Sequence, residues 1–130
     1  MSPSFTLDGI DHVALNVRDV EQSARWYCDL LGLERRHADV WGSHPAVVGT
    51  GTTSLALFPV QGPNPQPRPG RDVLTMRHIA FRASRRNFEL ALGALQARGI
   101  EPEIQDHQIS RSLYFHDPDG HEIEITTYET

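Results

Sequence analysis

Histidines and carboxylates are the side chains of this sequence best suited to hold a metal ion. The chain carries seven histidines but one cysteine and two methionines, so a metal site here would use nitrogen and oxygen ligands. His12 and His78 each stand in a short alternating segment, on the side opposite its apolar residues, and Glu124 does the same in a later segment. Two imidazoles and one carboxylate, with other positions left open, form a ligand set suited to Fe(II), Mn(II) and similar ions.

These three residues belong to two copies of one pattern, each a strand, a helix and three further strands. In the first copy, about residues 9–58, the segment 10–17 alternates as a strand, and Asp19 caps a helix that Gly32 ends. The further strands are expected over 33–41, 46–49 and 53–58. A linker over 59–72 holds five of the nine prolines, which excludes regular structure and favours an extended, exposed connection.

The second copy, about residues 73–128, repeats the plan. Residues 77–82 alternate as a strand, and Ser84 caps a helix that Gly99 closes. Strands are expected over 101–106, 112–116 and 121–127, with a tight turn from Asp117 to Gly120.

The spacing of matched positions supports a true internal repeat. His12 and His78 lie 66 positions apart, and Ala56 and Glu124 lie 68 apart. Ala56 therefore occupies the position symmetric to Glu124, and its side chain cannot bind a metal. The predicted fold is one α+β domain over residues 1–130, in which two βαβββ modules form a cup-shaped mixed or antiparallel sheet with helices outside.

Composition limits the classes of partner. The net charge of −5 argues against a general nucleic-acid or anionic-membrane surface, because both need a concentrated positive field. No apolar run approaches the ~20 residues of a membrane-spanning helix. The single cysteine, Cys28, and the lack of a signal-peptide pattern favour a reducing cytoplasm. We expect a small-molecule substrate.

Four segments resemble the vicinal oxygen chelate superfamily, which includes glyoxalase I, extradiol dioxygenases, fosfomycin-resistance enzymes and bleomycin-resistance proteins. They are Asp11-His-Val-Ala-Leu15, Trp26-Tyr-Cys-Asp-Leu-Leu-Gly-Leu33, Met76-Arg-His-Ile-Ala-Phe81 and Leu113-Tyr-Phe-His-Asp-Pro-Asp-Gly-His-Glu-Ile-Glu124. The resemblance implies a homodimer whose metal ligands are His12, His78 and Glu124. Fe(II) is favoured, with Mn(II), Zn(II) and Ni(II) as alternatives. It does not select one reaction, because the superfamily supports several on one metal site.

The extradiol dioxygenases give the best match around the last ligand. His107, Leu113-Tyr114, the Asp117-Pro118 and Gly120 turn, and Glu124 reproduce the order of their signature, although Gln105 departs from it. In that family the histidine is an acid and base, and the tyrosine bonds a catecholate oxygen. The alternative for His107 is a polar residue on a loop or an edge strand, and for Tyr114 an aromatic residue that lines the cup.

Two other chemistries use the same metal site. Fosfomycin-modifying relatives hold a phosphonate with polar and cationic residues near this stretch, where Arg111 stands, although a lone arginine on a strand is more often a surface charge. A glyoxalase-like lyase or isomerase is disfavoured by Ala56, because glyoxalase I carries a fourth ligand there.

A non-catalytic binding protein of the bleomycin-resistance type is the remaining alternative, disfavoured by the complete ligand set. In either an enzyme or a binding protein, Trp41 and Phe58 would form an aromatic wall of the pocket. His116 has the same strand parity as Tyr114 and is a further pocket candidate.

Overall fold

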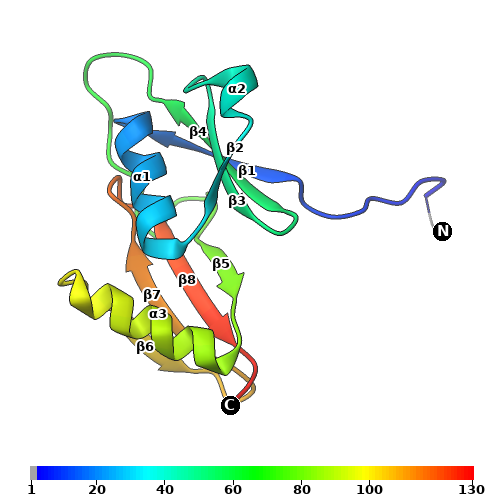
Figure 1. Ribbon diagram of the computed structural model, residues 1–130, viewed down its shortest axis with the longest axis vertical. Helices are drawn as coiled ribbons and strands as arrows, with labels where there is room; N and C mark the ends of the chain where they lie inside the picture. The colour runs from blue at the N-terminus through cyan, green and yellow to red at the C-terminus, as the bar shows by residue number, and fades with distance from the viewer. Residues whose placement is uncertain (1–2) are drawn as a thin grey trace. The chain divides into compact units, whose positions relative to one another are not determined.

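The protein, described here by a computed structural model, divides into two compact units: the first ends at Gln61 and the second runs over Gly62–Thr130. The structure describes residues 3–130, so residues 1 and 2 of the predicted domain lie outside the described residues. The first unit contains β1 (His12–Val17), α1 (Val20–Leu31), β2 (Glu34–Arg36), α2 (Ala38–Trp41), β3 (Ala46–Thr50) and β4 (Thr53–Pro59). Its sheet has the strand order β1-β4-β3-β2 (Figure 1).

The second unit has the same plan without the short α2. It contains β5 (Ile79–Arg82), α3 (Arg85–Ala97), β6 (Glu103–Asp106), β7 (Arg111–His116) and β8 (Glu122–Thr127). The strand order is β5-β8-β7-β6. Each unit is therefore a βαβββ module with an open, mixed four-stranded sheet, which confirms the predicted α+β class and the two modules.

The register of the sheets confirms the internal repeat at residue level. In each unit the first strand pairs in parallel with the last, and the remaining pairs are antiparallel. Ala14 is paired with Ala56 in the first sheet, and Ala80 is paired with Glu124 in the second. Ala56 and Glu124 thus occupy equivalent positions, as the spacing predicts.

Local capping sets where the long helices begin and end. The Asp19 side chain accepts a hydrogen bond from the backbone nitrogen of Gln22 at 3.0 Å, and Ser84 accepts one from Asn87 at 3.1 Å. Gly32 ends α1 in the left-handed conformation, with φ of 68°, which costs a glycine little. The predicted helix ends at Asp19, Gly32 and Ser84 are confirmed. Helix α3 ends slightly earlier than expected, because Arg98 is its C-cap and Gly99 follows in the left-handed conformation, with φ of 77°.

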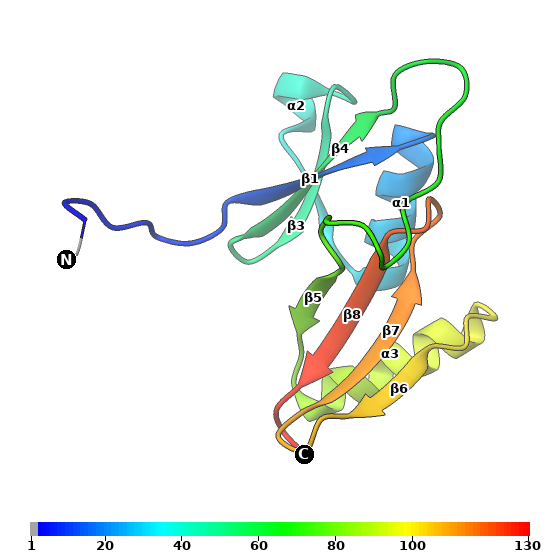
Figure 2. The same cartoon turned by 180° about the vertical axis from the view of Figure 1, so that it is seen from behind.

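Each sheet buries one face against its helix and leaves the other accessible within its unit. In β1, Leu15 and Val17 are buried, whereas His12, Ala14 and Asn16 are exposed. In the second unit, Phe88 and Leu95 of α3 are fully buried, and α3 lies along one face of the sheet (Figure 2). The alternation that the sequence shows therefore separates a helix-covered apolar face from a face that carries the polar candidates.

One predicted element is wrong in part. The strand expected over 33–41 shortens to β2, and Ala38–Trp41 form the one-turn helix α2. The backbone nitrogens of Val40 and Trp41 both donate to the carbonyl of His37, so the chain closes a turn instead of extending. The segment between β4 and β5 contains no helix or strand, as its prolines predict. None of the helices in residues 3–130 has the length and apolarity to cross a membrane.

Candidate metal and substrate site

His78 and Glu124 meet in the second unit. His78 directly precedes β5, and Glu124 lies in β8, the parallel neighbour of β5. The Nε2 atom of His78 is 2.8 Å from Oε1 of Glu124. The Glu124 side chain is 10% exposed and that of His78 27% exposed. The strand pairing therefore brings one nitrogen and one oxygen donor together at a largely buried position.

The second oxygen of Glu124 is held by the neighbouring strand. Ser112, fully buried in β7, donates a hydrogen bond of 2.6 Å from its Oγ to Oε2 of Glu124. The same Oγ lies 3.0 Å from the hydroxyl of Thr126, which in turn donates to the carbonyl of Arg111. A hydrogen bond to an ionised carboxylate is stronger than one between neutral groups, so this contact fixes the carboxylate plane.

His12 and His78 each have a carboxylate oxygen near their Nδ1 atom. In the first unit His12 Nδ1 is 2.9 Å from Oδ2 of Asp11, and in the second His78 Nδ1 is 3.4 Å from Oε2 of Glu122. Glu122 is buried, and its other oxygen accepts a 2.8 Å hydrogen bond from Arg71. A carboxylate beside Nδ1 orients an imidazole so that Nε2 is presented as a ligand.

Asp11, Ser112 and Glu122 are not among the candidates that the sequence pattern predicts. Two signals point to them. Glu122 stands two positions before Glu124, and Ser112 two before Tyr114, so each shares a strand face with a predicted site residue. Asp11 directly precedes His12. These signals become specific only when the register between β7 and β8 is known.

Tyr114 lies between two histidines of the second unit. Its hydroxyl is 3.0 Å from His107 Nε2, and its ring packs edge-on against His78, with centroids 5.7 Å apart. The β6–β7 turn carries the exposed His107, whose backbone nitrogen donates to the carbonyl of Ser110. Burial is the main cause that raises the pKa of Tyr114, and the negative charge of Glu124 raises it further. The phenol therefore stays protonated at neutral pH and can donate a hydrogen bond.

Arg111 does not join these residues. Its guanidinium lies over the ring of Phe88, 5.1 Å from the centroid, and its Nη1 is 3.4 Å from Oε1 of Glu89. Both partners belong to α3, on the sheet face opposite Tyr114. The structure thus assigns the side chain of Arg111 to the packing of the helix, whereas His116 lines a separate cavity of the second unit.

His12 lies in an aromatic-lined pocket of the first unit. The pocket has a volume of about 340 Å³, and its walls include Trp41, Phe58, Ala56 and His37. The ring of His37 lies against that of Trp41, with centroids 5.0 Å apart. The structure therefore brings His12 together with both residues expected to form an aromatic wall.

A complete three-residue metal site is not formed within one unit. No three His, Cys, Asp or Glu side chains meet as a metal-binding group in the described part of the chain, residues 3–130. His12 belongs to the first unit, and His78 and Glu124 belong to the second. The approach of His12 to this pair stays a prediction.

Comparisons with known proteins place these observations in a family. Catechol-2,3-dioxygenase of Bacillus subtilis (strain 168) is 29% identical over 122 residues, which cover 89% of this chain but only 40% of that protein. Metallothiol transferase FosB of Staphylococcus epidermidis (strain ATCC 12228 / FDA PCI 1200) is 29% identical over 128 residues, covering 93% of this chain and 82% of the transferase.

Solved structures and a family model agree with these relatives. The crystal structure of a glyoxalase/dioxygenase from Nostoc punctiforme is similar to this fold with a TM-score of 0.74 at 27% identity, covering 97% of this chain and 98% of the other. Residues 9–125 match the model of the Glyoxalase/Bleomycin resistance protein/Dioxygenase superfamily. This superfamily includes metal-dependent dioxygenases and transferases. The chain belongs to the Glyoxalase/Bleomycin resistance protein/Dioxygenase superfamily.

Proposed function

We propose that the protein is a divalent-metal-dependent enzyme whose ligands are His12, His78 and Glu124. The contact between Nε2 of His78 and Oε1 of Glu124, at 2.8 Å, is the observation that carries the proposal. It brings one nitrogen donor and one oxygen donor next to each other, while Ser112 holds the remaining carboxylate oxygen.

The residues present fit a metal ion. Nε2 is the free nitrogen of His12, because its Nδ1 is engaged by Asp11. Nδ1 of His78 is buried and makes no hydrogen bond within residues 3–130, and Oε2 of Glu122 lies 3.4 Å from it. A nitrogen-and-oxygen donor set suits Fe(II), which we favour, and also accommodates Mn(II), Zn(II) or Ni(II).

The reaction we favour is extradiol-like cleavage of a catechol-type substrate. A bound Fe(II) ion supplies the Lewis acidity and the redox chemistry that ring cleavage by dioxygen requires. Tyr114 donates a hydrogen bond from its phenol to a substrate oxygen, and His107 takes and returns a substrate proton. The 3.0 Å contact between the two residues joins them into one proton-handling pair. Trp41 and Phe58 offer flat apolar surfaces to an aromatic ring.

A transferase or hydrolase of the fosfomycin-modifying type is the second candidate. The similarity to FosB over 93% of the chain favours it, as do Arg71 and Arg77, which line one cavity together with His78. Arg111 gives it no support, because its side chain lies against α3. A glyoxalase-like lyase and a non-catalytic binding protein remain outcomes of the test.

Anaerobic reconstitution with Fe(II), followed by a panel of catechols in air, tests the proposal. We expect a coloured ring-opened product from at least one catechol. Glu124→Ala should lose metal and activity together, while the matched exposed change Glu101→Ala should retain both. Metal content unchanged in Glu124→Ala would overturn the ligand assignment. Thiol-dependent loss of an epoxide would select the transferase, loss of a hemithioacetal the lyase, and tight ligand binding without turnover the binding protein.

A further inference from the structure

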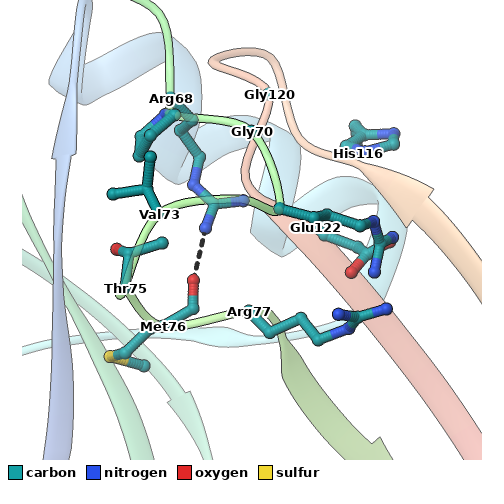
Figure 3. Close-up of a pocket in the computed structure, with 11 residues that line it drawn as sticks. Arg68, Gly70, Val73, Thr75, Met76, Arg77, His116, Gly120 and Glu122 are labelled. Atoms are coloured by element: carbon teal, nitrogen blue, oxygen red, sulfur yellow. Dashed lines mark hydrogen bonds and ion pairs between the residues drawn. The ribbon is translucent and has the colours of Figure 1, made fainter.

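The second unit contains a cavity whose walls are rich in arginine. Its volume is about 370 Å³, and the side chains of Arg68, Arg71 and Arg77 line it together with His116 and Glu122 (Figure 3). These are three of only twelve Lys and Arg residues in a chain with a net charge of −5. Positive charge is therefore concentrated at this cavity against the balance of the whole molecule.

The protein neutralises this charge only in part. Arg71 donates to Oε1 of Glu122 at 2.8 Å. Arg68 donates to the backbone carbonyl of Met76 at 2.6 Å, the dashed line in Figure 3. Among the described residues, the side chain of Arg77 has no hydrogen-bond or ion-pair partner. The three guanidinium groups line the cavity with one carboxylate, that of Glu122, and within residues 3–130 neither Arg68 nor Arg77 forms an ion pair. Guanidinium groups present paired donors that match the geometry of an oxyanion.

This cationic cavity adjoins the candidate metal site. A smaller cavity of about 260 Å³ in the same unit shares Arg71, Arg77 and Glu122 with the first, and its walls also include His78 and Tyr114. Glu122 links the arginines to the candidate metal site, because one of its oxygens accepts a hydrogen bond from Arg71 and the other lies 3.4 Å from Nδ1 of His78. A molecule with an oxyanion in the first cavity would therefore extend toward His78 and Tyr114.

We propose that Arg68, Arg71 and Arg77 bind an oxyanion, a carboxylate or a phosphonate or phosphate group, and that the substrate is an anionic small molecule. The assignment of this anion to the substrate rests on the proposed function. Binding of the oxyanion itself depends only on the three arginines. The segment between β4 and β5, expected to be only a linker, then contributes specificity.

Calorimetric titration of metal-stripped, dialysed protein tests the oxyanion site. The probes are inorganic phosphate, 3,4-dihydroxybenzoate and uncharged catechol. We expect phosphate or the benzoate to bind at least about tenfold more tightly than catechol, and the preference between the two identifies the oxyanion. Arg77→Gln should weaken oxyanion binding by about tenfold or more, since a hydrogen bond to a charged group is lost. Arg86→Gln, an exposed change on α3, is the matched control and should bind as the unaltered protein does.

Equal binding of all three probes, or identical binding by Arg77→Gln and Arg86→Gln, would overturn the proposal. Arg68→Gln provides a second variant should Arg77→Gln fail to fold. Glu124→Ala separates this proposal from the proposed function, because it should lose metal while still binding phosphate. A protein that binds phosphate through Arg77 but takes up no divalent metal would refute the metal site and leave the oxyanion site standing.

Discussion

Ser112 donates a 2.6 Å hydrogen bond to Oε2 of Glu124, while the other oxygen of that carboxylate faces Nε2 of His78. One contact comes from β7 and the other from the residue directly before β5, and these strands are the two neighbours of β8. The orientation of Glu124 is thus set by the sheet itself. A ligand whose partners are built into a sheet needs little reorganisation when a metal binds.

Ser112→Ala should therefore weaken metal binding by about 10- to 100-fold, because the carboxylate loses its orienting donor. It should also lower the free energy of unfolding by roughly 2 kcal/mol, since a buried charged acceptor is left unsatisfied. Titration with Mn(II) and urea denaturation measure the two effects. Ser110→Ala is the matched control, a buried serine just before the same strand. Equal metal affinity in the two variants would show that Ser112 does not orient Glu124.

Tyr114→Phe tests the proton-handling pair. The change keeps the ring beside His78 and removes only the hydroxyl that lies 3.0 Å from His107. We expect kcat for a cleaved catechol to fall by about 10²- to 10³-fold, the usual cost of losing one hydrogen-bond donor to a reacting oxygen, while metal content stays constant. Steady-state kinetics with metal analysis distinguish the effects. A variant that loses metal but not turnover per bound metal would assign Tyr114 to packing alone.

The sequence predicts those parts of the fold that depend on local physics. The caps at Asp19 and Ser84 follow from side-chain bonds to the backbone three residues later, and β1 follows from strict alternation. The turn at Ala38–Trp41 does not follow from local preference, because Val40 and Trp41 favour strands while backbone hydrogen bonds to His37 close a helical turn.

The candidate site shows the same division. His12, His78 and Glu124 stand out because residue type, strand parity and the repeat all agree. Ser112 and Glu122 are recognised only through the pairing of β7 with β8, which spacing alone does not determine. The arginines of the segment between β4 and β5 line a cavity only because distant parts of the chain fold together. The sequence of this segment, rich in proline, therefore predicts only a linker.

The contact between Glu21 and Arg35 makes stability depend on pH. Arg35 donates two hydrogen bonds, at 2.9 and 3.1 Å, to the Glu21 carboxylate, and Ser43 donates another. The hydrogen bonds from Arg35, and to a smaller extent the one from Ser43, lower the pKa of Glu21 from 4.5 to about 2. A lowered pKa in the folded state stabilises the protein above the unfolded value, and this stabilisation is lost as pH falls from 4.5 toward 2.

Glu21→Gln should consequently destabilise the protein at pH 7 and have a smaller effect near pH 2. The Glu21 side chain is 51% exposed, so solvent screening limits the difference at pH 7 to about 1 kcal/mol or less. Urea denaturation at several pH values measures the difference, with the neighbouring exposed Glu34→Gln as control. If the difference in the free energy of unfolding between Glu21→Gln and the unaltered protein does not change with pH, the ion pair does not contribute to stability.

Two glycines should respond in opposite directions to replacement by alanine. A Cβ at Gly93, exposed within α3, would meet no atom within 4 Å, and the backbone there is helical. Gly93→Ala should raise the free energy of unfolding by about 0.5–1 kcal/mol, because glycine loses more backbone entropy in a helix than alanine. Thermal denaturation would show a higher midpoint.

Gly49 in β3 has no such space. A Cβ there would lie 2.5 Å from the backbone oxygen of Thr53 and 2.6 Å from Nη1 of Arg36. The Arg36 guanidinium cannot easily move aside, because it also donates to Ser54 and to the carbonyl of Gly51. Gly49→Ala should therefore lower the free energy of unfolding by roughly 1–3 kcal/mol, the usual cost of overpacking. A midpoint equal to that of Gly93→Ala would mean that the β3–β4 pairing and the side chain of Arg36 relax around the added methyl group.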